Sequence, residues 1–214
     1  MSLGLDTVKY RNHEVVLRPA VDLRRTLLDA SLDLIANEGL ERLSMREVAR
    51  RAGVSHQAPY HYFEDREAIL AEIVAEGFAS LRDDMLEAIE GLDDPHARLT
   101  AIGNAYVAFA LSRPAHFKLM FRSELVRQER HGEAEACAQS AFDVLVSTIN
   151  DVPARGRAHA DPALVLAAWA LAHGAATLLL EGKLDRHCGK GRRARVAAAE
   201  GILGVFEQLL RHRS

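Results

Sequence analysis

The sequence of 214 residues lacks the short motifs that mark common enzyme chemistries. It contains no G-x-x-x-x-G-K-[ST], no G-x-S-x-G and no H-E-x-x-H, and the GKG stretch at residues 189–191 does not have the spacing of a phosphate loop. Ten histidines and two cysteines are scattered without metal-ligand spacing, and we read the pair His187 and Cys188 as part of a loop. We therefore expect no catalytic residues, no bound metal and no cofactor.

Signals for export and for membrane insertion are also weak. Cys137 and Cys188 form no CxxC pair, which favours a reducing, cytoplasmic compartment. Residues 1–19 contain no apolar run of signal-peptide length and are expected to form a flexible leader. The apolar stretch 163–180 is barely long enough to span a bilayer and contains His173, Gly174 and Thr177. We expect it to be a helix buried on several sides by protein, and we expect no membrane partner.

Strand signals are nearly absent, because no segment alternates polar and apolar residues and no Asn-Gly or Asp-Gly turn occurs. Alanine and leucine are abundant, and apolar residues recur at helical spacing. The sequence therefore predicts an all-α protein. The expected helices cover residues 20–37, 44–52, 66–90, 96–111, 114–127, 132–150, 162–180 and 192–211.

Residues 44–63 predict two short helices joined by a tight turn. Ser44 and Glu47 have the spacing of a capping box, in which each side chain satisfies a free backbone N–H at the helix start. Gly53 permits a left-handed exit from the first of these helices, and Ser55 is expected to cap another that begins at His56. Such a pair is a helix-turn-helix.

The charge distribution gives this motif a function. The whole chain has a formal net charge of -3, yet residues 42–63 contain four arginines and only one acidic residue, Glu47. The following residues, 64–99, contain eleven acidic and three basic side chains. Positive potential is therefore confined to one end of the protein, which predicts end-on binding of double-stranded DNA that weakens steeply with salt.

The same segment strongly resembles the DNA-binding segment of TetR-family transcriptional regulators. The family pattern is matched at Val48-Ala49, at Ala52-Gly53-Val54-Ser55, and at Tyr60 and Phe63. Pro59 stands where an aliphatic residue is usual, Tyr62 where histidine is common and Arg66 where lysine is common. We expect Pro59 to shorten or tighten the recognition helix without removing it.

A second, shorter resemblance lies at residues 168–174, where Trp169, His173 and Gly174 look like the Trp-His-Gly segment of one TetR-type regulatory domain. Together the two resemblances imply a homodimer with an N-terminal reader of operator DNA and a helical domain that binds a small-molecule effector. The implied domains are a leader at 1–19, a helix-turn-helix domain at 20–64 and a regulatory and dimerisation domain at 65–214.

A recognition helix docks its N-terminal residues in the major groove while neighbouring elements contact phosphates, and this geometry indicates which residues bind DNA. The residues expected to contact base edges are Ser55, His56, Gln57 and His61. Those expected to contact phosphates are Ser44, Arg46, Tyr60, Tyr62 and Arg66. Arg50 and Arg51 are read as ordinary solvated charge, and Phe63 as a core residue. Tyr60 fits either the core or the interface.

The effector is expected to be largely apolar and to lie between helices of the bundle. For any one candidate, simple packing in the core is favoured over contact with the ligand, and His173 fits a hydrogen-bonded structural role better. The candidates are Phe78, Met85, Tyr106, Phe109, Phe117, Met120, Phe121, Trp169 and His173.

Small and apolar residues of the last two predicted helices suit a two-fold contact of four helices, two from each chain. Such a dimer sets two recognition helices roughly 34–36 Å apart and predicts a nearly palindromic operator. Two other functions stay open at this point: a helix-turn-helix protein that acts mainly through a protein partner, and, more distantly, a helical-bundle enzyme. Whether ligand releases or recruits DNA binding is open too, with relief of repression as the expectation from the family.

Overall fold

The computed structural model describes residues 22–127, 130–152 and 161–213 and confirms the all-α prediction, with no strand among them. The predicted leader at 1–19 lies outside the described residues. The helices are α1 Leu23–Glu38, α2 Met45–Ala52, α3 Arg66–Ala88, α4 Pro95–Ser112, α5 Pro114–Met120, α6 Gly132–Asn150, α7 Pro162–Leu180, α8 Asp185–Cys188 and α9 Arg192–Arg213. Short 3-10 helices lie at Leu40–Arg42, Ala58–His61 and Ser123–Leu125.

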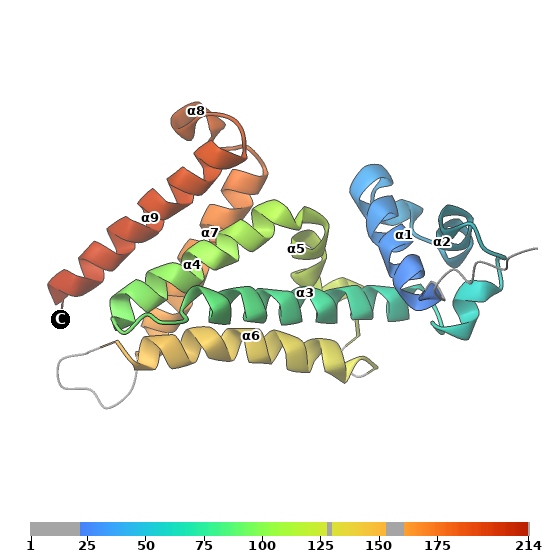
Figure 1. Ribbon diagram of the computed structural model, residues 1–214, viewed down its shortest axis with the longest axis horizontal. Helices are drawn as coiled ribbons and strands as arrows, with labels where there is room; N and C mark the ends of the chain where they lie inside the picture. Colours follow the sequence, from blue (N-terminus) through green and yellow to red (C-terminus); the bar gives the residue numbers. More distant parts are fainter. Residues whose placement is uncertain (1–21, 128–129, 153–160, 214) are drawn as a thin grey trace, which may run out of the picture.

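The long helix α3 connects the two parts of the molecule (Figure 1). Helices α1 and α2 lie at its N-terminal end, and α6 runs along its length. On another side α3 packs against α4, which in turn packs against α7 and α9. A 23-residue helix is about 34 Å long, so α3 extends from the helix-turn-helix to the far end of the bundle.

Side-chain caps explain where several helices begin. Ser44 accepts a hydrogen bond from the backbone N–H of Glu47, and Asp65 accepts one from that of Ala68. Asp94 and Asp161 do the same for α4 and α7, each followed by a proline that suits the first helical turn. The second half of the predicted capping box is not formed, because the Glu47 carboxylate pairs with Arg50 instead.

One hydrophobic core runs through both parts of the chain. Leu27 of α1, Val48 of α2 and Phe63 in the connection before α3 are at most 3% exposed. Ile69 and Ile73 of α3 are fully buried beside them. The core continues through α3 into the bundle. The burial of Phe63 confirms its reading as a core residue.

Three predicted elements outside the helix-turn-helix were wrong in detail. The helix expected over 114–127 ends at Met120, and the chain continues as a separate 3-10 helix. His187 and Cys188 belong to the four-residue helix α8 rather than to a loop. Helix α7 was expected to be buried on several sides, yet only 33% of its apolar 18-residue window, of mean hydropathy 1.9, is buried.

The exposed face of α7 is the physical reason for the last difference. Leu166 is 55% exposed, Trp169 38% and Leu178 44%. On α9, Val205 and Leu209 are 58% and 59% exposed. Helix α7 is therefore apolar on two sides of a single chain: one side packs on α4 and the other presents leucines to the surface.

Helices α4 and α9 approach closely at Gly103. A Cβ atom added there would lie 3.1 Å from Cδ1 of Leu203, tighter than an ordinary van der Waals contact. The absence of a side chain at Gly103 therefore allows α9 to lie directly on the α4 backbone.

Candidate nucleic-acid interface and ligand cavity

The turn after α2 forms as its residue types require. Gly53 has a left-handed backbone with φ 71°, and the N–H of Val54 donates to the Ala49 carbonyl at 3.0 Å. This closes α2 in one residue. The predicted exit at Gly53 is confirmed.

The recognition helix predicted from His56 does not form as an α-helix, and the Ser55 side chain caps no helix in the described part of the chain. Residues 55–57 form a turn, followed by the 3-10 helix Ala58–His61 with Gln57 at its N-cap position. Pro59 supplies the reason, because it has no N–H with which to continue an α-helix from Ser55. The N–H groups of Ala58, Tyr60 and Tyr62 instead donate to the carbonyls three residues earlier. Pro59 was expected to shorten or tighten the recognition helix without removing it, but a 3-10 helix of four residues stands in place of the α-helix.

The side chains assigned to DNA lie on the surface of this tip. Ser55, His56, Gln57 and His61 are all exposed, as are Ser44 and Arg46 at the start of α2. Tyr60 is 53% exposed and Tyr62 43%, so Tyr60 is a surface residue rather than a core one. Pro59 is fully buried, so its ring anchors the turn to the hydrophobic core.

Most arginines of the basic segment have acidic partners within the protein. Arg50 pairs with Glu47, and Arg51 pairs with Asp33 and Glu38. Arg42 is 3.7 Å from Glu38. These contacts agree with the reading of Arg50 and Arg51 as ordinary surface charge. Within the described ranges, Arg46 is the arginine of this segment that has no ion pair.

Arg66 is directed inward rather than towards the surface that would face DNA. Its Nη2 donates to the Leu40 carbonyl at 2.8 Å, and its buried Nε has no hydrogen-bond partner in the described part of the chain. Arg66 therefore ties the start of α3 to the connection between α1 and α2. This placement argues against the phosphate contact assigned to it.

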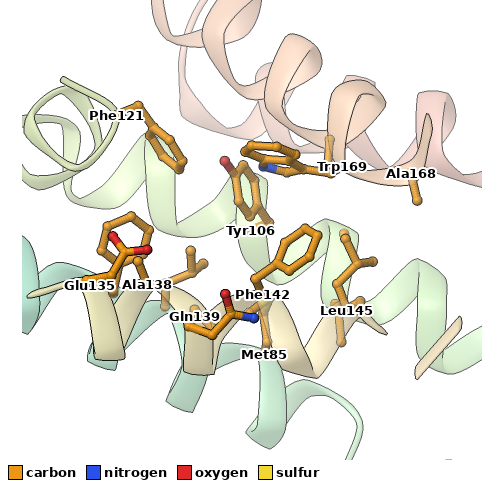
Figure 2. A pocket seen from close by; sticks show the side chains of 16 residues that line it. Met85, Tyr106, Phe121, Glu135, Ala138, Gln139, Phe142, Leu145, Ala168 and Trp169 are labelled. Atoms are coloured by element: carbon orange, nitrogen blue, oxygen red, sulfur yellow. The ribbon is translucent and has the colours of Figure 1, made fainter. Parts of the chain in front are cut away.

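A cavity of about 360 Å³ lies in the bundle between α3, α4, α6 and α7 (Figure 2). Five of the nine candidate ligand residues line it: Phe78, Met85, Tyr106, Phe121 and Trp169. Its other walls come from Leu81, Ile102, Gly103, Glu135, Ala138, Gln139, Ala141, Phe142, Leu145, Ala168 and Ala172. A mainly apolar enclosure with few polar groups is typical of a small-molecule site.

Four candidates lie elsewhere. Phe117 and His173, together with Phe121, border a smaller hollow of about 170 Å³ next to the cavity. Phe109 is 1% exposed, and the Arg113 guanidinium lies 5.2 Å from its ring centre. Met120 packs its thioether against α3 at Gly77, where an added Cβ would lie 2.7 Å from the sulfur.

His173 is a hydrogen-bonded histidine within an aromatic cluster. Its Nδ1 is 2.8 Å from the Tyr106 hydroxyl, and its ring centre is 4.6 Å from that of Phe121. Burial raises the pKa of Tyr106 and lowers the pKa of His173, so both side chains are neutral near pH 7. The pair orients the Tyr106 ring, which forms part of the cavity wall.

Sequence reasoning missed the wall that α6 contributes. Glu135, Ala138, Gln139, Phe142 and Leu145 line the cavity from one helix face. Their spacing of three and four residues is visible in the sequence, but the polar residues at its start hide the pattern. The sequence signal for this wall was the pair Glu135 and Gln139 on a helix face that is otherwise apolar.

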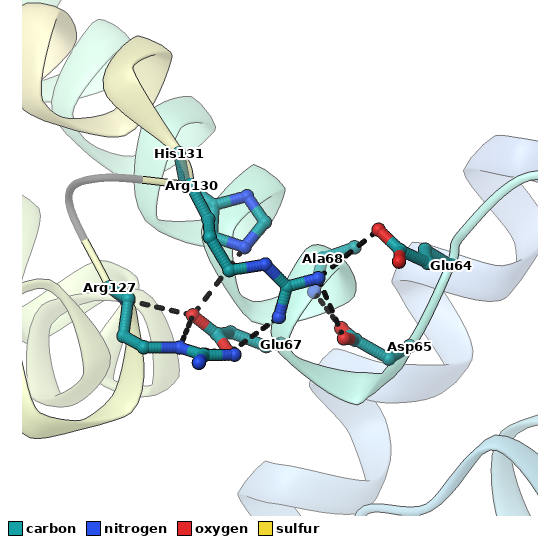
Figure 3. Close-up of polar contacts among 7 residues, drawn as sticks. All are labelled: Glu64, Asp65, Glu67, Ala68, Arg127, Arg130 and His131. Carbon is teal, nitrogen blue, oxygen red and sulfur yellow. Dashed lines mark hydrogen bonds and ion pairs between the residues drawn. The ribbon is translucent and has the colours of Figure 1, made fainter.

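A cluster of ion pairs connects the start of α6 with the start of α3 (Figure 3). Arg127 donates from Nη2 to Glu67 Oε2 at 2.7 Å, and Arg130 contacts Glu64, Asp65 and Glu67 at 3.1–3.2 Å. The Arg127 side chain and backbone lower the pKa of Glu67 to about 2. We call Glu67, Arg127 and Arg130 the interdomain clamp, because Glu67 lies five positions after Tyr62 in the first turn of α3, and Arg127 and Arg130 precede α6, which lines the cavity.

Two family models match the chain. Residues 27–73 match the bacterial regulatory proteins of the tetR family, and residues 99–211 match the tetracyclin repressor-like C-terminal domain. The chain is 35% identical over 79 residues to the HTH-type transcriptional regulator BetI of Rhizobium meliloti, over 37% of this chain and 39% of that protein. It is 34% identical over 123 residues to BetI of Klebsiella pneumoniae, over 50% of this chain and 63% of the relative.

These matches span less than two thirds of the length of either relative. A protein of unknown function from Rhodococcus sp. RHA1 has a similar structure over 90% of this chain and 96% of its own, with a TM-score of 0.72 and 28% identity. The chain belongs to the TetR family of transcriptional regulators. Proteins of this family bind DNA, typically act as dimers and are not enzymes.

Proposed function

We propose that this protein is a ligand-responsive repressor that binds a nearly palindromic operator as a homodimer. The observation that carries the proposal is that an exposed tip and an internal cavity lie in different parts of the molecule and share one continuous hydrophobic core. An exposed tip at residues 44–62 carries the DNA-facing side chains, and a cavity of about 360 Å³ lies in the bundle. The division into a reader at 20–64 and a regulatory domain at 65–214, in a cytoplasmic protein, belongs to this proposal.

The reader would place its turn, rather than a long recognition helix, in the major groove. Ser55, His56, Gln57 and His61 are assigned to base edges, and Gln57 suits an adenine edge. Ser44, Arg46, Tyr60 and Tyr62 are assigned to phosphates, where the free N–H groups at the start of α2 also favour an anion. Arg66 takes the structural role that its bond to Leu40 supports.

The homodimer would form through α7 and α9. Their outward faces carry Leu166, Leu178, Val205 and Leu209, each at least 44% exposed in the single chain. Exposed apolar side chains of this size are costly in water, and a contact across a two-fold axis buries both copies at once. This arrangement would set the two tips on successive major grooves.

The test is selection of operator sequences in vitro with the purified protein, followed by sedimentation of the protein alone. Two inverted half-sites about one helical turn apart, bound by a dimer, are expected. Enrichment of a single unrepeated site, or a monomer at working concentration, would contradict the proposal. A protein that binds no duplex at low salt would instead favour the alternative, a helix-turn-helix protein that acts through a protein partner.

A further inference from the structure

The connection between α7 and α9 carries positive charge that the DNA-facing tip does not account for. Residues 181–195, which include α8, contain six lysines and arginines and two acidic residues, Glu181 and Asp185. Five of the six basic side chains are exposed to solvent: Lys183, Arg186, Lys190, Arg192 and Arg193. We call these five residues the α8 basic surface.

The side chains of the α8 basic surface have no ion pair or hydrogen bond within the described ranges of the chain. Most other arginines in these ranges pair with carboxylates, among them Arg98 and Arg113. Asp185 does not neutralise the surface, because Nε and Nη2 of Arg195 donate to its two carboxylate oxygens at 3.0 and 2.9 Å. Lys190 attracts Asp185 only from beyond ion-pair distance. Five cations without internal partners leave a positive potential that is available to an external anion.

The backbone that presents these cations is held by contacts between α8 and α9. The ion pair of Asp185 and Arg195 packs against Gly182, where an added Cβ would lie 3.1 Å from each of the two side chains. The N–H of Gly189 also donates to the Asp185 carbonyl at 3.1 Å. A polyanion that binds here has to order long side chains but not the backbone, which lowers the entropic cost of binding.

The α8 basic surface and the tip lie in different parts of the chain (Figure 1). The tip is at the N-terminal end of α3, whereas α8 lies where α7 ends and α9 begins, with α4 and α5 between it and α1. Each of the two surfaces can therefore meet its own segment of a polyanion.

We propose that the α8 basic surface binds the phosphates of duplex DNA, and that the segment it holds is a second one, separate from the segment at the tip. Three of its five residues are arginines, whose planar guanidinium groups bind phosphate oxygens through paired hydrogen bonds. Because phosphates carry no base identity, this contact is independent of sequence and weakens with salt. It requires neither the ligand response nor the operator symmetry of the proposed function.

Two other anionic partners fit the surface less well. A membrane-binding surface combines cations with apolar side chains that enter the lipid, and residues 181–195 present no large exposed hydrophobic side chain. The acidic stretch 64–99 of a second copy carries carboxylates that already have internal partners, among them Glu67, Glu76 and Asp84. Binding to lipid and binding to a second copy give distinct results in the experiment.

Two triple variants with the same change in net charge form the comparison. The surface variant removes three cations of the α8 basic surface: Lys190→Gln, Arg192→Gln and Arg193→Gln. The control variant removes three arginines that carboxylates hold outside both the tip and the surface: Arg82→Gln, Arg98→Gln and Arg122→Gln. Circular dichroism and thermal melting check that each protein is folded.

Both sets of substitutions are also made in a protein whose tip carries Arg46→Ala and Gln57→Ala, so that the surface is measured with the tip weakened. Fluorescence anisotropy with a short random duplex follows binding from low to moderate salt. The tip variant is expected to keep low-salt binding. The surface substitutions are expected to weaken this binding about tenfold and to reduce the salt slope by about two to three, and the control substitutions to change the affinity by less than about twofold.

A capture measurement tests whether the second segment is separate. Protein saturating an immobilised duplex is exposed to a labelled duplex of different sequence, and the wild type and the control variant are expected to retain at least about five times more label than the surface variant. Equal capture by all three proteins, or equal losses of affinity in the surface and control variants, would overturn the proposal.

Two further results would overturn it in favour of another partner. One is loss of binding to phosphatidylglycerol vesicles in the surface variant while its DNA binding is unchanged. The other is salt-sensitive self-association of the DNA-free protein that the surface variant loses, again with DNA binding unchanged. If selection yields no operator but the tip variant still binds duplex through the α8 basic surface, the proposed repressor is contradicted and this proposal stands.

Discussion

Arg127 holds Glu67 with both its backbone and its side chain: the backbone N–H donates to Oε1 at 2.8 Å and Nη2 donates to Oε2 at 2.7 Å. Glu67 lies in the first turn of α3, directly after the DNA-facing tip. Arg127 precedes α6, whose face lines the cavity. The interdomain clamp is therefore a polar connection between the start of α3 and the helix that lines the cavity, the two regions that the proposed ligand response would couple.

Glu67→Gln is expected to lower the thermal stability of the protein near neutral pH and to have little effect in strong acid. The pKa of Glu67 falls from 4.5 to about 2 in the folded protein, so its contribution to stability is fully present above pH 4.5 and is lost as the pH falls towards 2. Melting temperatures of both proteins across this range give the test. A difference between them that does not change with pH would contradict it.

Gln57→Ala is expected to weaken binding to the selected operator by roughly 1–3 kcal/mol and binding to random duplex by much less. The reason is that an exposed amide can pair with a base edge but has no charge for the phosphates. His61→Ala should behave in the same way. Fluorescence anisotropy on both duplexes at one salt concentration measures the two losses, and equal losses would remove these residues from base readout.

Arg46→Ala is expected to weaken binding to operator and random DNA alike and to reduce the salt slope of binding by about one. Arg46 is exposed at the N-terminus of α2, where a phosphate would also meet the free backbone N–H groups. Arg50→Ala is the matched control, because Arg50 is held by Glu47. A salt slope that changes as much in Arg50→Ala would contradict the assignment.

Arg66→Ala is expected to destabilise the fold by about 1–3 kcal/mol, since the Leu40 carbonyl loses a charge-assisted hydrogen bond. The salt slope of DNA binding should stay as in the wild type. Urea unfolding measures the first quantity and DNA titration the second. Unchanged stability with a reduced slope would restore a phosphate role for Arg66.

Leu209→Glu is expected to convert the protein to a monomer that is still folded. Leu209 is 59% exposed on α9, so a carboxylate is tolerated in the single chain but is costly at a two-fold contact. Leu86→Glu on α3 is the control, because Leu86 is 46% exposed and lies outside the proposed contact. Sedimentation and circular dichroism give the two readouts, and a dimeric Leu209→Glu protein would place the contact elsewhere.

Local chemistry made much of the fold predictable. Gly132 and Pro162 fall at the first residues of α6 and α7, and both helices have the predicted bounds. Pro59 was recognised as a disturbance, but whether the chain there forms a short α-helix or a 3-10 turn depends on the hydrogen bonds that the neighbouring carbonyls can receive. The end of α5 at Met120 likewise depends on tertiary packing.

The ligand site was harder to predict, because an aromatic residue in a bundle can face a cavity or a neighbouring helix. Phe109 and Met120 are the same residue types as Phe78 and Met85, which line the cavity. Phe109 nevertheless lies under Arg113, and Met120 packs against α3. Only the three-dimensional packing separates these cases. The same packing brings Glu135 to the cavity, and the sequence analysis did not single this residue out.

Gly103 has a consequence for how this protein can evolve. It lines the cavity on one side of α4, while α9 rests on it from the other through Leu203. A methyl group at this position would point at Leu203, so it would press α9, the helix proposed to join the subunits, away from the helix that forms one wall of the cavity. Ligand preference and quaternary arrangement are thus linked through one residue, and a lineage that alters one of them there inherits a change in the other.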